Sequence, residues 1–153
     1  MSVGLARHLP PEAITVGARA ADWQEALRLA GAGLVAAGAT TDAYSDEMVA
    51  AVTELGPYIV VAPGLALAHS RPSPAVLRAG LSWVGLAEPV SFGHSTNDPV
   101  DLVVGLAALD HDGHIDMMSA LAAVLADEDA LARLRAASSP DEVLAILSDL
   151  TTD

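Results

Sequence analysis

The chain has 153 residues, and its 52% of hydrophobic residues include no uninterrupted apolar run of the roughly eighteen residues that a membrane span requires. Its formal net charge of −13 opposes binding to nucleic acid or to an anionic membrane surface, because repulsion would act before contact. It has no cysteine, which excludes disulfides and thiol chemistry, and the stretch before Pro10 is too short for a secretory signal. We therefore expect one domain over residues 1–153, in the cytoplasm, with protein or small-molecule partners.

Two helices are predicted in the first third of the chain. Asp22 can cap the first helix with Glu25 three residues later, and apolar residues then recur at helical spacing until Gly38. The second helix can start near Thr41 and end before the breaker pair Gly56-Pro57.

Three strands are predicted in the middle of the chain. The continuous apolar run Tyr58–Ala62 suits a central strand that is covered on both faces. The segments Leu81–Leu86 and Leu102–Ala108 are two further candidates, since turn or breaker residues bound them. The segment Val90–Phe92 is too short to assign.

Two more helices are predicted after the last strand. Apolar residues recur at helical spacing from Ile115 to Leu125, just before the acidic group 127–129. Ser139, Pro140 and Glu142 then form a helix start with a capping box. Alternation of strands with helices, without a linker or repeat, favours an α/β fold.

The most informative segment is 56–72, GPYIVVAPGLALAHSRP, where His69 follows a strand-like run and Arg71 lies two residues later. Open α/β sheets usually place their chemistry at such strand ends. A neutral imidazole can act as a nucleophile, and a guanidinium can hold phosphoryl oxygens, so the pair suggests phosphoryl transfer. The alternatives are a loop histidine without a role and an arginine that only pairs with an acidic side chain.

His114 is the second candidate. It stands at the expected start of a helix, where main-chain amides and the imidazole could donate hydrogen bonds to a phosphoryl group. The alternative is a histidine that merely caps the helix.

The other histidines fit less specific roles. His94 and His111 lie in polar, turn-rich segments, and His8 lies near the terminus. A metal site is a separate hypothesis, because imidazole and carboxylate suit zinc or non-haem iron. Its ligands would be drawn from His69, His94, His111 and His114 with Asp110 or Asp112. The chain has no His-Glu-x-x-His motif to support it, and no phosphate-binding Gly-x-x-x-x-Gly-Lys-Ser/Thr loop that would imply a nucleotide.

Four segments in a fixed order are far more specific than one His-x-Arg pattern: 56–72, 88–93 (EPVSFG), 97–100 (NDPV) and 106–125, which contains His114. In these segments the chain resembles the cytoplasmic EIIA component of the bacterial phosphoenolpyruvate-dependent sugar phosphotransferase system (PTS). The resemblance is to the fructose-mannitol type (EIIA type-2), and is closest to its ascorbate-like branch.

The resemblance implies an α/β fold with a mixed central sheet flanked by helices. It implies that His69 is the phosphorylated histidine and that His114 helps to hold the phosphoryl group. From its position two residues after His69, Arg71 is expected to add positive charge. The implied donor is the phosphorylated carrier protein HPr. The acceptor is a cysteine on the IIB component, which serves a membrane component IIC. No metal or other cofactor is implied, and a homodimer stays open.

The chain departs from the family at the residue before the active histidine. The usual proline is replaced by Ala68, which we expect to relax the backbone there, while the Ser70 hydroxyl can add a hydrogen bond to phosphate. A second function is open on the same fold, namely a regulator whose phosphorylation state controls a partner protein. The transported sugar is not encoded in this chain.

Overall fold

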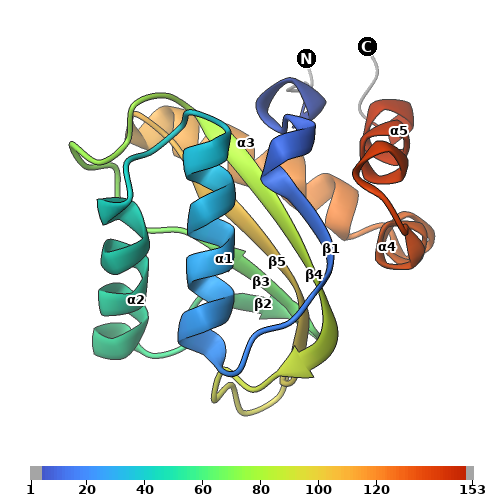
Figure 1. The fold of residues 1–153 in the computed structure, drawn as a ribbon, viewed down its shortest axis with the longest axis horizontal. Coiled ribbons are helices and arrows are strands. Elements are labelled where there is room, and N and C mark those ends of the chain that lie inside the picture. The colour runs from blue at the N-terminus through green and yellow to red at the C-terminus, as the bar shows by residue number, and fades with distance from the viewer. Residues whose placement is uncertain (1–4, 151–153) are drawn as a thin grey trace.

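Five strands form one mixed β-sheet at the centre of the computed structural model, which describes residues 5–150 (Figure 1). The strands are β1 (Ile14–Ala18), β2 (Val60–Ala62), β3 (Leu65–Ala68), β4 (Gly80–Val90) and β5 (Val100–Ala107). Their order across the sheet is β1-β4-β5-β3-β2. The pairs β1–β4 and β3–β5 are parallel, whereas β4–β5 and β2–β3 are antiparallel.

Helices cover both faces of the sheet. They are α1 (Trp23–Ala36), α2 (Ala43–Leu55), α3 (His111–Leu125), α4 (Glu128–Ala136) and α5 (Pro140–Leu150), with the short 3₁₀ helices η1 (Leu5–His8) and η2 (Pro11–Ala13) before β1. In Figure 1, α1 and α2 lie in front of the sheet and α3 lies behind it. The α/β fold with a mixed sheet flanked by helices is thus confirmed.

The predicted helix starts follow their capping residues. The Asp22 carboxylate accepts a hydrogen bond from the Glu25 amide at 2.9 Å, and the Ser139 hydroxyl accepts one from the Glu142 amide at 3.2 Å. The helix α2 ends at Leu55, just before the breaker pair as predicted, and Gly56 is its C-cap. These signals are local, because a cap needs only the residues of its own first turn.

The prediction of a central strand over Tyr58–Ala62 is wrong. Only Val60–Ala62 is extended, and this strand β2 is at the edge of the sheet, where Val61 is 47% exposed. The chain turns back at Gly64, which has a φ of +75°, and β3 follows as the inner strand of a hairpin. The fully buried strand before His69 is therefore Leu65–Ala68, and His69 itself is half-buried.

Four further elements were either not predicted or have different bounds from those predicted. The strand β1 and the helix α4 were not predicted, and α3 begins at His111, three residues before His114. The strand β4 extends to Val90, which pairs with Val100 of β5. Asp127 lies between α3 and α4 and caps α4, because its carboxylate accepts the Ala130 amide at 3.1 Å.

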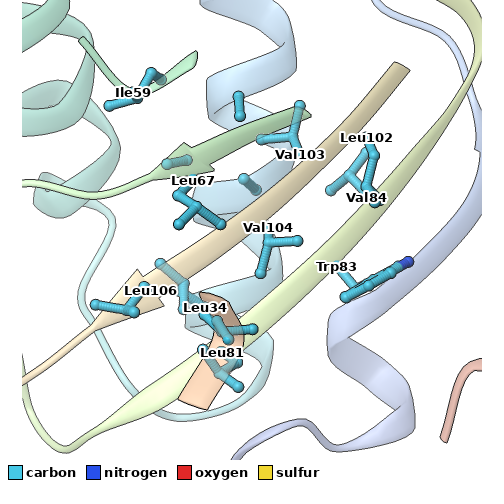
Figure 2. Close-up of a cluster of buried hydrophobic side chains, with 14 of the residues drawn as sticks. Leu34, Ile59, Leu67, Leu81, Trp83, Val84, Leu102, Val103, Val104 and Leu106 are labelled. Atoms are coloured by element: carbon cyan, nitrogen blue, oxygen red, sulfur yellow. The ribbon is translucent and has the colours of Figure 1, made fainter. Parts of the chain in front are cut away.

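The core lies on the inner strands, where α1 approaches β4 and β5 closely. The Ser82 hydroxyl on β4 donates to the Ala30 carbonyl of α1 at 2.7 Å. A side chain at Gly105 would collide with that hydroxyl, so a glycine is required at this crossing. Figure 2 shows the buried side chains around this crossing, among them Leu34, Leu67, Leu81, Trp83, Val104 and Leu106.

The strand pairing also restrains the residue before His69. Ala68 is the last residue of β3, is fully buried, and is paired with Gly105 of β5. This pairing restrains the backbone at Ala68, which opposes the relaxation expected from the missing proline.

Candidate functional site

Two histidines from distant parts of the chain meet at one end of the sheet. His69 directly follows β3, and α3, which carries His114, begins shortly after β5. Since β3 and β5 are parallel neighbours, their carboxyl ends lie side by side. The two imidazole rings are tilted by 57°, with centroids 5.1 Å apart. Both rings therefore border one reaction volume.

The His69 ring is oriented by its own strand. Its Nδ1 lies 2.7 Å from the Leu67 carbonyl oxygen, and because a carbonyl can only accept, Nδ1 carries the proton of this bond. The Nε2 atom of the neutral ring then has its lone pair free. Burial lowers the pKa of His69, and the bond to Leu67 opposes that effect. The arrangement favours a neutral imidazole that can attack through Nε2.

His114 is half-buried and faces His69 from the first turns of α3. Its pKa is lowered by burial and further by the nearby His69 and His111. Its Nδ1 is buried, and no residue within 5–150 gives it a hydrogen-bond partner. The expected free amide is not at His114, because that amide already donates to the Asp110 carbonyl at 3.0 Å. Its imidazole is thus the group available to a ligand.

Arg71 lies at the edge of this site and is exposed. Within residues 5–150 its guanidinium takes part in none of the ion pairs, which involve Arg19, Arg28 and Arg135. Its charge acts on Tyr58, where burial raises the pKa of the phenol and Arg71 partly offsets the rise. The structure thus holds the two histidines together but leaves Arg71 without a fixed partner among the described residues.

Two tyrosines belong to this end of the sheet and were not predicted there. The Tyr58 ring stands edge-on to His69 with centroids 5.4 Å apart, and its hydroxyl donates to the His69 carbonyl at 2.9 Å. The Tyr44 hydroxyl bonds to the main chain of Ser70. Tyr44 lies within the predicted second helix and is buried. A buried phenol needs a polar partner, which is the one signal that could have drawn attention to it.

The remaining histidines do not join the pair. The Nδ1 of His94 accepts the amides of Thr96 and Asn97, at 3.2 and 3.0 Å, which orders its own loop. His111 is exposed, and His8 lies in η1. Within the described residues, no group of three or more histidine, aspartate or glutamate side chains is placed to hold a metal ion. The ligand set of the metal hypothesis is therefore not assembled.

Comparisons with known proteins identify the family. Residues 7–150 match the family model described as "Phosphoenolpyruvate-dependent sugar phosphotransferase system, EIIA 2". The "Ascorbate-specific PTS system EIIA component" of Escherichia coli strain K12 is 37% identical over 137 residues, which cover 89% of each chain.

Solved structures agree with this match. The solution structure of the mannitol-specific cryptic phosphotransferase enzyme IIA CmtB from Escherichia coli has a TM-score of 0.86 at 33% identity, covering 96% of this chain and 99% of that one. The mannitol enzyme IIA of Escherichia coli, solved in complex with phosphorylated mannitol enzyme IIB, has a TM-score of 0.80 at 31% identity. That match covers 92% of this chain and 97% of that one.

The mixed α/β sheet flanked by helices is the fold that this chain shares with these proteins. The chain belongs to the EIIA type-2 family of the sugar phosphotransferase system and is a phosphotransferase. No helix within residues 5–150 is both long and apolar enough to cross a membrane.

Proposed function

We propose that this protein is a cytoplasmic phosphocarrier that takes a phosphoryl group from phosphorylated HPr onto His69 and passes it to a cysteine of a IIB component. The observation that carries this proposal is the His69 ring. Its Nδ1 is engaged by the Leu67 carbonyl, its Nε2 is free, and His114 lies beside it.

In the first step, the Nε2 lone pair of neutral His69 attacks the phosphorus of phosphorylated HPr. A P–N bond forms to His69 as the P–N bond to the HPr histidine breaks, and the electron pair of that bond returns to HPr. The His69 ring becomes positively charged and keeps its Nδ1 proton, which the Leu67 carbonyl stabilises at 2.7 Å. Such a transfer depends on positioning and charge stabilisation more than on proton transfer.

In the second step, the thiolate of the IIB cysteine attacks the same phosphorus from the opposite side. A P–S bond forms, the P–N bond breaks, and His69 leaves as the neutral ring. His114 donates a hydrogen bond to an oxygen of the phosphoryl group, and the exposed Arg71 side chain moves toward the group to add positive charge. Neither residue needs to change its protonation state permanently, so the site returns to its starting form.

The IIB component would then phosphorylate a sugar during its uptake by the membrane component IIC. The 37% identity to the ascorbate-specific EIIA of Escherichia coli supports an ascorbate-like substrate. A purely regulatory EIIA-like protein would accept phosphate on the same histidine but would not pass it to a IIB cysteine. The second transfer step therefore separates the two functions.

The test is to incubate the protein with phosphoenolpyruvate, enzyme I and HPr, and to locate the acid-labile phosphate by mass mapping. We expect His69 to carry it and His69→Ala to carry none, whereas the control His8→Ala is labelled like the wild type. Addition of an ascorbate-type IIB component should then discharge the protein. Equal labelling of His69→Ala would overturn the assignment, and a labelled protein that IIB cannot discharge would favour the regulator.

A further inference from the structure

The hydroxyl of Tyr44 occupies an unusual place for a helix side chain. Tyr44 lies in the first turn of α2 and is only 1% exposed. Its oxygen accepts a hydrogen bond from the Ser70 amide at 2.9 Å. It lies 3.1 Å from both the Ser70 and the Leu106 carbonyl oxygens, which share its single proton. Burial raises the pKa of Tyr44 to about 12, so the hydroxyl keeps this proton at neutral pH.

These hydrogen bonds lie just beyond the end of the pairing between strands β3 and β5. The pairing of β3 with β5 ends at Ala68 and Gly105. One residue beyond β3 is His69, and the main chain of Ser70 then bonds to the phenol through both its N–H and its C=O group. The phenol thereby takes the position that a neighbouring strand would take, and it fixes the residue next to the proposed nucleophile.

The third partner connects Tyr44 to the other histidine. Leu106 is the last residue but one of β5, and the chain then leads through Ala107 and Asp110 into α3, which presents His114. One oxygen atom therefore contacts both segments that carry the paired rings. The 5.1 Å separation of the His69 and His114 centroids depends on how these segments are spaced.

We propose that Tyr44 is a positioning residue for phosphoryl transfer, because its hydroxyl clamps the segment after β3 to the end of β5 and so sets the distance between His69 and His114. The inference rests on the proposed function. The inference adds to the proposed mechanism a buried hydroxyl that contacts neither the phosphoryl group nor an imidazole ring. A displacement of about 1 Å in a reacting group is enough to slow a reaction by about a hundredfold, so a clamp of this kind matters for rate.

The test is Tyr44→Phe, which removes the oxygen and keeps the ring. We expect the rate of phosphoryl transfer from phosphorylated HPr to fall by about tenfold to a hundredfold, with the same final extent of labelling on His69. The rings should also drift apart and become more solvated. In an NMR titration the pKa of His114 should therefore rise toward its ordinary value, because burial and the charge of His69 both lower it in the wild type.

The matched control is Ser82→Ala, which also removes a buried hydroxyl that donates to a main-chain carbonyl. It contacts neither Ser70 nor Leu106 through that hydroxyl, so it should cost stability without changing the rate or the His114 titration. If Tyr44→Phe behaves like Ser82→Ala in both measurements, Tyr44 is only a structural residue and the inference is wrong. If the wild type is not labelled at all, the proposed function fails first.

A measurement on the wild type covers the case in which Tyr44→Phe does not fold. Because the phenol oxygen accepts the Ser70 amide, this amide should exchange with D₂O slowly although it lies outside the sheet. Exchange as fast as that of an exposed loop amide, such as the one of Ser95, would overturn the clamp itself.

Discussion

The imidazoles of His69 and His114 make the stability of the protein depend on pH. Burial is the main cause that lowers the pKa of each below the ordinary value of 6.5. Well above pH 6.5 both rings are neutral in the folded and the unfolded chain. As the pH falls through 6.5, the unfolded chain binds protons that the folded chain resists, so the free energy of unfolding decreases until the pH passes the folded pKa values.

We therefore expect urea unfolding to show a loss of stability between about pH 7.5 and about pH 5.5. The control is the double variant His69→Gln, His114→Gln, which cannot titrate at these positions and should lose less stability over the same range. An equal loss in both proteins would mean that other groups cause the pH dependence. Transfer activity should persist somewhat below pH 6.5, because the neutral ring of His69 is the nucleophile.

Removal of the His114 imidazole tests its role in holding the phosphoryl group. His114→Ala should leave the fold intact and His69 open to phosphorylation, because the nucleophile and its bond to Leu67 remain. The transfer rate should fall by about tenfold to a thousandfold, the range for loss of one preorganised donor. Rapid-quench kinetics with HPr and with IIB measure it. Unchanged rates with both partners would reduce His114 to a structural residue.

The N-terminal cap of helix α3 affects both the stability of the protein and the position of His114. The Asp110 carboxylate accepts the Gly113 amide at 2.7 Å, one residue before His114. Asp110→Ala should lower the free energy of unfolding by about 0.5–2 kcal/mol and should also slow transfer, because the first turn of α3 frays. Asp22→Ala removes the equivalent cap of α1 and is the matched control. Asp22→Ala should lower the stability by a similar amount in thermal melts while the transfer rate stays normal. If both variants slow transfer equally, the cap of α3 has no specific effect on the site.

Helix starts were predictable because their signals are local. Asp22, Thr41 and Ser139 precede apolar residues at helical spacing, and the helices follow as expected. The helix α4 was missed since the acidic run at 127–129 was interpreted only as the end of α3, although Asp127 is also a cap. The strand predicted over Tyr58–Ala62 is not central, because Pro63-Gly64 is a strong turn signal that reverses the chain and makes β3 the inner strand.

The pairing of the two candidate histidines could not be predicted from spacing. His69 and His114 meet only because β3 and β5 are adjacent and parallel, and that order depends on packing across the whole sheet. The resemblance to a known family supplied the pair instead. The contact of Tyr44 with Ser70 and Leu106 is equally non-local. The need of a buried phenol for a polar partner predicts some hydrogen bond, but it does not identify these two partners.

At the scale of the whole molecule, charge and apolar surface act on a partner at different distances. The chain has 20 acidic residues against 7 basic ones, so it attracts a basic surface from afar. Beside the paired histidines, Tyr58, Leu109 and Ile115 are exposed apolar side chains that act only on contact. A phosphoryl donor that approaches this end would therefore be steered by charge and held by short-range packing.

Attraction by net charge predicts that the rate of phosphorylation depends on ionic strength. If the docking face of HPr is basic, the second-order rate constant for phosphorylation of His69 should fall by about tenfold between about 0.05 M and about 0.5 M NaCl, because salt shortens the range of the attraction to the net charge of −13. Hydrolysis of the isolated phosphorylated protein, which needs no partner, is the control and should change little. Stopped-flow kinetics at several salt concentrations provide the measurement. A rate constant that stays level or rises with salt would show that the net charge does not guide the encounter, and that contacts around Tyr58 and Ile115 determine its rate.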